Sequence, residues 1–262
     1  MGVVNVTPDS FSDGGLWLDP EAAVAHGLEL LGQGAEILDV GGESTRPGAE
    51  PVEEAEELRR VEPVVSGLHS RAPAAVISID TMKASVAEAA IAAGASYVND
   101  VTALLGDPRM AGVVARAGCG VCLMHMAGTP QTMQDDPAYD DVVGDVVSFL
   151  ARRAEAAVAA GIAREQIQLD PGIGFGKSLE HNLELLRRLD EIAAIGFPVV
   201  VGVSRKRFLG AITGREEPAE RVAASVAAAL LAWERGASVL RVHDVAATVD
   251  ALRVATATLG AR

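Results

Sequence analysis

The sequence has no long hydrophobic run and few basic residues. Its longest apolar stretch, residues 222–233, holds about a dozen residues, whereas a helix needs about 20 to cross a bilayer. The first residues lack the charged region and the cleavage site of a signal peptide. Lys and Arg number 22 against 36 Asp and Glu, and a net charge of −14 argues against the basic face that binds nucleic acid. We therefore expect a soluble, cytoplasmic protein that binds neither membranes nor nucleic acid.

Cysteine is also scarce, and its placement argues against two kinds of site. The only two cysteines, Cys119 and Cys122, form a C-x-x-C. Redox pairs of this spacing sit where a strand gives way to a helix, but here a predicted helix gives way to a strand. No second pair completes a zinc site. We expect buried, reduced thiols in a reducing compartment.

Lysine occurs only three times, and two of the three lie in loops after predicted strands. Lys177 and Lys206 follow glycine- or serine-bearing turns. An acidic protein that keeps cations in such loops is suited to bind a small anion. For any one lysine, a place on the solvated surface is the more common alternative.

Eight repeats of strand, loop and helix run through the chain. Apolar runs with high β propensity alternate with longer segments of helical period, at intervals of roughly 30 residues. Strands joined by one helix must be parallel, because the helix is the crossover. The predicted strands are 2–6, 36–40, 75–80, 96–99, 120–125, 166–170, 199–203 and 239–242. The predicted helices are 20–32, 52–68, one from near 82, one from near 108, 140–160, 179–195, 218–235 and 245–258.

This pattern predicts an α/β fold: a single-domain (β/α)8 TIM barrel spanning residues 1–262. A doubly wound open sheet is the alternative, but it rarely needs eight evenly spaced units. No linker or low-complexity segment divides the chain. Because the first strand begins at residue 2, we expect the strand pair that commonly closes the bottom of such barrels to be absent.

Each predicted strand ends in a polar or charged residue. At one strand, such a residue can simply mark the exit from the core. In TIM barrels, however, the active site lies at the C-terminal ends of the strands, so eight such ends together predict a polar cup at one mouth. The residues are Asn5, Asp39, Asp80, Asn99, His125, Asp170, Lys206 and Arg241 with His243.

The cup divides into two chemical halves. Carboxylates and an amide at Asp80, Asn99 and Asp170 suit a flat heterocycle with several N–H donors. The positive half, which suits phosphate, consists of Arg46, Lys206, Arg241 and His243. Asn5 offers a neutral oxygen to a hydrated divalent cation such as Mg²⁺. A Mg²⁺-bound diphosphate is a leaving group, so we predict displacement at carbon.

Two long loops and one glycine-rich stretch complete the candidate site. Residues 7–15 and 41–48 exceed the usual 2–6 residues of a βα loop and are interpreted as lids, although simple connections are the alternative. The stretch 169–178 resembles two phosphate motifs but matches neither. Its G-x-x-x-G-K-S is one residue short of a P-loop, and its third glycine comes one position early for a dinucleotide fingerprint.

With these segments, the chain resembles the dihydropteroate synthases, folate-pathway enzymes of the pterin-binding barrel family. Two matching segments are long and specific: GVVNVTPDSFSDGG at 2–15 and DVGGESTRPG at 39–48. A third, LDPGIGFGK at 169–177, is the glycine-rich stretch itself. Shorter matches lie at 78–81, 98–101, 124–126, 204–206 and 241–244.

The resemblance implies a transferase that needs Mg²⁺. In this reaction 4-aminobenzoate displaces pyrophosphate from the methylene of a 7,8-dihydropterin diphosphate, giving 7,8-dihydropteroate by an SN1-like route with no general base. Sulfonamides occupy the aminobenzoate pocket in this family. The family also favours a homodimer, and the apolar helix predicted at 222–233 is consistent with a buried subunit face.

The resemblance also implies roles for individual residues. Catalytic roles fall to Asp80, Asp170, Lys206, Arg46 and Asp13. The pterin is bound by Asp80, Asn99, Asp170, Lys206, Met124 and Gly202, and the pyrophosphate by Asn5, Arg46, Arg241 and His243. The 4-aminobenzoate pocket consists of Phe11, Thr45, Pro47, Phe175, Ser204 and Arg205. Asp13 and Asp39 support the lids, and Asn5 holds the metal.

Two rival functions stay open. A pterin-binding methyltransferase on the same barrel would keep the pterin carboxylates but has no need of the Mg²⁺ asparagine or of two anion-binding lids. A non-catalytic pterin-binding protein would be expected to lose lid or aminobenzoate residues. The presence of Asn5 and of both loops counts against the methyltransferase. The presence of Phe11, Thr45, Arg46, Pro47 and Lys206 counts against the non-catalytic protein.

Overall fold

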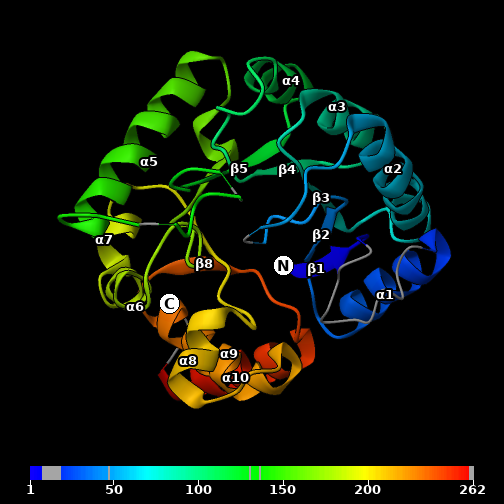
Figure 1. Ribbon diagram of the computed structural model, residues 1–262. Coiled ribbons are helices and arrows are strands. Elements are labelled where there is room, and N and C mark those ends of the chain that lie inside the picture. Colours follow the sequence, from blue (N-terminus) through cyan, green and yellow to red (C-terminus); the bar gives the residue numbers. More distant parts are fainter. Residues whose placement is uncertain (8–18, 47, 130, 136, 260–262) are drawn as a thin grey trace.

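Eight parallel strands form one sheet that curls into a barrel (Figure 1). The computed structural model describes residues 1–7, 19–46, 48–129, 131–135 and 137–259. Neighbours in the sheet follow chain order from β1 to β8, and a parallel bridge between Gly2 and Val242 joins the two ends of the sheet. The TIM barrel is therefore confirmed. The strands are β1 (Gly2–Asn5), β2 (Ile37–Gly41), β3 (Val76–Asp80), β4 (Tyr97–Asp100), β5 (Gly120–Met124), β6 (Ile167–Asp170), β7 (Val199–Val201) and β8 (Ala237–Leu240).

A ring of helices surrounds the strands (Figure 1). Each crossover of a parallel sheet needs such a connection, and the helices cover the outer face of the barrel. The helices are α1 (Pro20–Gly32), α2 (Glu54–Arg71), α3 (Ala84–Ala92), α4 (Met110–Ala117), α5 (Val142–Ala159), α6 (Leu179–Arg187), α7 (Leu189–Ala193), α8 (Arg207–Thr213), α9 (Val222–Glu234) and α10 (Val245–Leu259). Short 3-10 turns span Arg164–Gln166 and Pro218–Arg221. Among the described residues, no helix is long and apolar enough to cross a membrane.

Local sequence explains where several helices begin. Asp19 precedes α1 and accepts a hydrogen bond from the Glu21 backbone N–H at 3.1 Å, and Pro20 occupies the first helical position. Ser178 caps α6 in a reciprocal arrangement with His181. These signals place α1 and α6 at the residues where they were expected to start.

Apart from shifts of up to three residues at their ends, the predicted helices differ from the structure in three places. Residues 218–221 of the helix expected at 218–235 form a 3-10 turn before α9. The helix expected at 179–195 is divided into α6 and α7, because Arg188 leaves the helical region with φ −111° and ψ 30°. The helix α8 was not predicted. It is only 7 residues long and follows β7 after the short loop 202–206, and it is held by burial of Phe208 and Leu209. Seven residues are too few for a periodic pattern to stand out.

The apolar core has two parts. The larger part lies between the strands and the surrounding helices, and a smaller cluster of Tyr97, Cys122 and Val200 is separate from it. Side chains two residues apart on a strand share a face. The residues that follow these at intervals of two, such as Asn99 and Met124, therefore point into the barrel nearer its C-terminal mouth. Both cysteines are free and buried, as expected.

Candidate active site

The strand register brings the first polar side chains together. Asn5 lies opposite Gly41, Gly41 opposite Asp80, and Asp80 opposite Asn99, so these positions form one rung across β1 to β4. Met124 and Asp170 form a similar pair on β5 and β6. Parallel strands end at the same edge, so the C-terminal mouth collects these groups from sequence-distant segments. The predicted polar cup is present at these positions.

An arginine joins two buried carboxylates in the middle of the cup. The Arg241 Nε donates to Asp39 Oδ2 at 2.6 Å, and its Nη2 donates to Asp80 Oδ2 at 2.9 Å. Burial opposes the guanidinium charge, but Asp39 and Asp80 outweigh it and raise the pKa of Arg241. Burial and the nearby Asp39 charge raise the pKa of Asp80 to about 7. Arg241 therefore neutralises carboxylates as well as lining the mouth.

Asp39 lies inside the barrel and binds three neighbours. Its carboxylate is fully buried; it accepts hydrogen bonds from Ser78 Oγ at 2.5 Å and from Asn99 Nδ2 at 3.0 Å, in addition to the Arg241 bond. Sequence reasoning gave Ser78 no role, although its spacing of two from Asp80 on β3 places both on one face. These contacts orient Asn99 and Arg241. The predicted lid support by Asp39 stays a prediction.

Asp170 and Lys206 form the opposite side of the cup. Asp170 is 6% exposed and accepts a hydrogen bond from the Gly172 N–H at 2.7 Å. Burial raises its pKa, and Lys206 opposes the rise. Burial lowers the pKa of Lys206 to about 8. Its Nζ donates to the Ile173 carbonyl and lies 4.6 Å from the centre of the Phe175 ring.

Glycine is required where the 171–178 loop turns back over the strands. Gly172 has φ +65°, and a Cβ there would lie 1.9 Å from the His125 carbonyl oxygen. Gly174 has φ +84°, and its Cβ would lie 3.0 Å from Lys206 Cδ. Only glycine tolerates both the conformation and the close approach. The loop therefore lies close against the Lys206 side chain.

Lys177 and His125 do not contribute to the cup as expected. Lys177 is 3% exposed; its Nζ lies 3.0 Å from His125 Nδ1 and donates to the Phe175 carbonyl at 2.9 Å. The His125 ring packs edge-on against Phe149. Burial lowers the pKa of Lys177 to about 7, and burial with Lys177 lowers that of His125 to about 3. Neither the anion-binding role nor the surface role considered for Lys177 fits. Its buried ammonium instead holds the 171–178 loop in place through His125 and the Phe175 carbonyl.

His243 is held beside the cup by Ser204. The Ser204 Oγ accepts from the His243 backbone N–H at 3.2 Å and lies 3.1 Å from its Nδ1. Burial, then Arg241 and Arg205, lower the pKa of His243 to about 3. The imidazole is therefore neutral near pH 7. Its place in the positive half of the cup was wrong, although a neutral ring can still donate one hydrogen bond.

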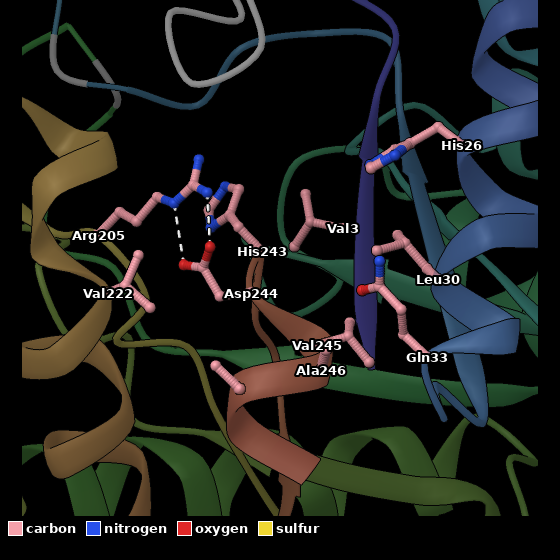
Figure 2. Close-up of a pocket in the computed structure, with 11 residues that line it drawn as sticks. Val3, His26, Leu30, Gln33, Arg205, Val222, His243, Asp244, Val245 and Ala246 are labelled. Atoms are coloured by element: carbon pink, nitrogen blue, oxygen red, sulfur yellow. Dashed lines mark hydrogen bonds and ion pairs between the residues drawn. The ribbon is translucent and has the colours of Figure 1, made fainter. Parts of the chain in front are cut away.

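A pocket adjoins this flank of the site. It has a volume of about 280 Å³ and lies between α1 and the start of α10 (Figure 2). Arg205 and His243 line one side, and His26 of α1 lines the other. Arg205 forms a two-fold ion pair with Asp244, at 3.0 and 2.6 Å. Its backbone has φ +59°, a strained value for a residue with a side chain.

The structure describes some of the remaining predicted site residues and not others. Thr45 and Arg46 lie in the loop after β2, and Gly202 lies directly after β7, with Lys206 Nζ 3.8 Å from the Cβ position. Met124 is buried at the end of β5. Phe11, Asp13 and Pro47 lie outside the described residues, as does most of the predicted first lid.

Asn5 is the neutral oxygen donor at the mouth that a hydrated Mg²⁺ would need. A Cβ on Gly41 would lie 3.8 Å from both Asn5 Oδ1 and Asp80 Oδ2, but Asp80 Oδ2 already accepts from Arg241. Among the described residues, no group of three His, Cys, Asp or Glu side chains could hold a metal alone. A cation that keeps most of its water and binds through its substrate needs only one or two protein oxygens.

Comparisons with known proteins agree with this geometry. The family described as "Pterin binding enzyme" matches residues 1–243. The chain is 50% identical to the dihydropteroate synthase of Neisseria meningitidis serogroup B over 259 residues, covering 97% of this chain and 90% of that protein. Among solved structures, Xanthomonas albilineans dihydropteroate synthase with 4-aminobenzoic acid is 54% identical with a TM-score of 0.93, covering 100% of this chain and 93% of that one. The Yersinia pestis dihydropteroate synthase in a sulfonamide drug complex is 46% identical with a TM-score of 0.96, covering 100% and 94%.

Proposed function

Because this chain belongs to the family of pterin-binding enzymes, we propose that the polar mouth of its barrel is the active site of a dihydropteroate synthase. The enzyme joins a 7,8-dihydropterin-6-ylmethyl diphosphate to 4-aminobenzoate and releases pyrophosphate. One observation carries the assignment of the site. Buried carboxylates at Asp80 and Asp170 face a mouth that also holds Arg241 and Lys206.

The pterin ring binds among Asp80, Asn99 and Asp170. A pterin presents several N–H donors in one plane, and a carboxylate accepts two or more of them. Asp170 uses one oxygen for the Gly172 N–H and keeps the other for the ring. Asn99 is oriented by Asp39, and Lys206 covers the ring's acceptor atoms. Met124 and Gly202 leave a flat apolar wall beside it.

Bond cleavage precedes bond formation in the SN1-like displacement. The bond between the methylene carbon and the diphosphate oxygen breaks with its electron pair on the leaving group. The resulting positive charge spreads into the dihydropterin, where Asp170 and Asp80 stabilise it. The amine nitrogen of 4-aminobenzoate then attacks the carbon and loses its proton to solvent. We assign no general base, because an arylamine needs positioning more than deprotonation.

The departing diphosphate faces the positive half of the mouth. Arg46, Lys206 and Arg241 supply charge, and neutral His243 supplies one hydrogen bond. Mg²⁺, when bound at Asn5, neutralises the charge that develops on the leaving oxygens. The bound diphosphate already carries negative charge, and one further negative charge develops on it as the bond breaks. These groups speed the reaction only through their stronger interaction with that added charge.

The 4-aminobenzoate lies between the loops after β2, β6 and β7. Thr45, Phe175, Ser204 and Arg205 shape this pocket, together with Phe11 and Pro47. The Arg205–Asp244 pair and the Ser204–His243 contacts hold its polar wall in place. A sulfonamide, which has a similar arylamine, would occupy the same space and compete with this substrate.

Metal removal tests the function directly. With dihydropterin diphosphate and 4-aminobenzoate, we expect pyrophosphate release that falls by at least about a hundredfold when Mg²⁺ is chelated and returns when it is restored. Mass spectrometry should identify 7,8-dihydropteroate as the product. Asn5→Ala should raise the Mg²⁺ concentration for half-maximal rate by about tenfold. Release that does not depend on Mg²⁺ would contradict the metal role, and binding without turnover would favour the non-catalytic alternative.

We also propose a cytoplasmic homodimer. Both cysteines are free, as in a reducing compartment. The neighbouring helices α8, α9 and α10 each expose a large apolar side chain: Ile212, Leu231 and Val254. Sedimentation should give twice the chain mass of 27.0 kDa, and Val254→Glu should shift it toward the monomer. A monomeric wild-type protein would argue against the dimer, and cell fractionation checks the compartment.

A further inference from the structure

The loop that carries Thr45 and Arg46 starts from a fixed base. Gly42, its first residue after β2, lies directly on α2: a Cβ there would be 2.7 Å from Val61 Cγ1 and 3.1 Å from Glu57 Cγ. The Arg60 Nη1 donates to the Gly42 carbonyl at 2.8 Å. The base of the loop is thus held by packing on one side and by a charged donor on the other.

The next residue, Glu43, ties together both ends of the loop. One carboxylate oxygen accepts the Val52 backbone N–H at 3.2 Å, nine residues further along. The other lies 2.6 Å from the Lys83 ammonium. The Glu43 side chain is only 9% exposed. One side chain therefore brackets the segment with Thr45 and Arg46 and attaches it to the loop after β3.

Lys83 in turn binds a second carboxylate inside the protein. Its Nζ lies 2.5 Å from Glu57, a fully buried residue of α2 that also accepts from Thr81 Oγ1 at 2.6 Å. Burial raises the pKa of Glu57, while Lys83 and Thr81 oppose that shift. A buried ion pair of this kind adds little net stability compared with apolar packing, but it fixes geometry. Its position beneath the loop that carries Thr45 and Arg46 points to a role in holding that loop.

We propose that Glu43, Glu57 and Lys83 form a clamp that positions Thr45 and Arg46 for 4-aminobenzoate and the diphosphate. The proposal rests on the function given above. Lys83 lies three residues after Asp80, so the clamp fixes the position of the loop after β2 relative to β3, the strand that holds the pterin. None of the three need touch a substrate; they act as positioning residues.

Lys83→Met tests the clamp, because methionine keeps most of the unbranched side chain and removes the ammonium group. We expect the KM for 4-aminobenzoate to rise about tenfold and kcat to fall about threefold, because Thr45 and Arg46 are displaced together. The Kd for 6-hydroxymethyl-7,8-dihydropterin, which lacks the diphosphate, should stay unchanged, because Asp80, Asn99 and Asp170 bind that ring. Lys83→Arg should restore most of the loss. Arg116→Met, which breaks an exposed pair with Glu88, is the matched control.

A second variant keeps the test independent of folding. Glu43→Gln leaves the pair between Lys83 and Glu57 of α2 intact and should give the same rise in KM. The double variant should be no worse than either single one, because both break one link. An unchanged KM in folded Glu43→Gln would overturn the clamp, as would equal loss of binding for the diphosphate-free pterin. If the wild-type protein itself does not turn over, the proposed function fails instead.

Discussion

Asp170→Asn is expected to lower kcat/KM for the dihydropterin diphosphate by about a thousandfold, equal to about 4 kcal/mol of transition-state stabilisation. Asparagine has the same shape, and its oxygen can still accept the Gly172 N–H. The change removes the negative charge and replaces one carboxylate oxygen with an NH₂ group. That group is a donor, and it would face the N–H donors of the ring. The Asp170 side chain itself is nearly inaccessible to solvent, so water does not replace the lost charge.

Steady-state kinetics and calorimetric pterin binding measure this effect. Both kcat and the affinity for the pterin should fall, because the carboxylate binds the ring and stabilises its cation. The control is Asp190→Asn, which changes an exposed carboxylate of α7 in the same way. Its rate should not differ from wild type. Turnover within threefold of wild type in Asp170→Asn would reject this carboxylate as the pterin ligand.

Arg241→Met is expected to cause the largest loss of stability, about 3 kcal/mol. The substitution leaves Asp39 and Asp80 without their shared cation, and Asp39 is fully buried. An uncompensated buried charge costs more than the intact pair contributes. Urea unfolding followed by circular dichroism gives the free energy. Turnover should also fall by at least about a hundredfold, because the diphosphate loses a positive partner.

Two further variants separate charge from geometry at this position. Arg241→Lys keeps the cation but loses the planar fork that spans two carboxylates, so its stability should lie between wild type and Arg241→Met. Arg253→Met breaks an exposed pair with Asp250 and should cost less than about 1 kcal/mol. If Arg241→Met and Arg253→Met proved equally mild, the central role of Arg241 would be wrong.

The polar cup could be predicted because parallel strands all end at one edge. Asp80, Asn99 and Asp170 follow apolar runs directly, and the structure places all three at the mouth. The same reasoning failed for His125, which directly follows β5 but whose ring turns away into packing with Phe149. A position after a strand fixes the edge of the barrel, not the direction of a long side chain.

The charge states of the buried groups could not be predicted from the sequence either. His243 looks like a cation beside phosphate, yet burial and the neighbouring arginines keep it neutral. Lys206 and Lys177 follow similar loops, and both have lowered pKa values because both are enclosed. Protonation depends on desolvation and on charges that arrive from other strands, and neither is encoded locally.

By itself, the sequence determined the barrel, its active end and the family, because apolar period, loop length and motif order are local properties of the chain. Only the tertiary structure decided which charges meet. Arg241 reaches Asp39 across 202 residues of sequence, and Lys83 reaches Glu43 across 40. Those partnerships exist because closure of the barrel brings β8 beside β1 and sets the loop after β2 against the one after β3. Spacing along the chain carries no record of them.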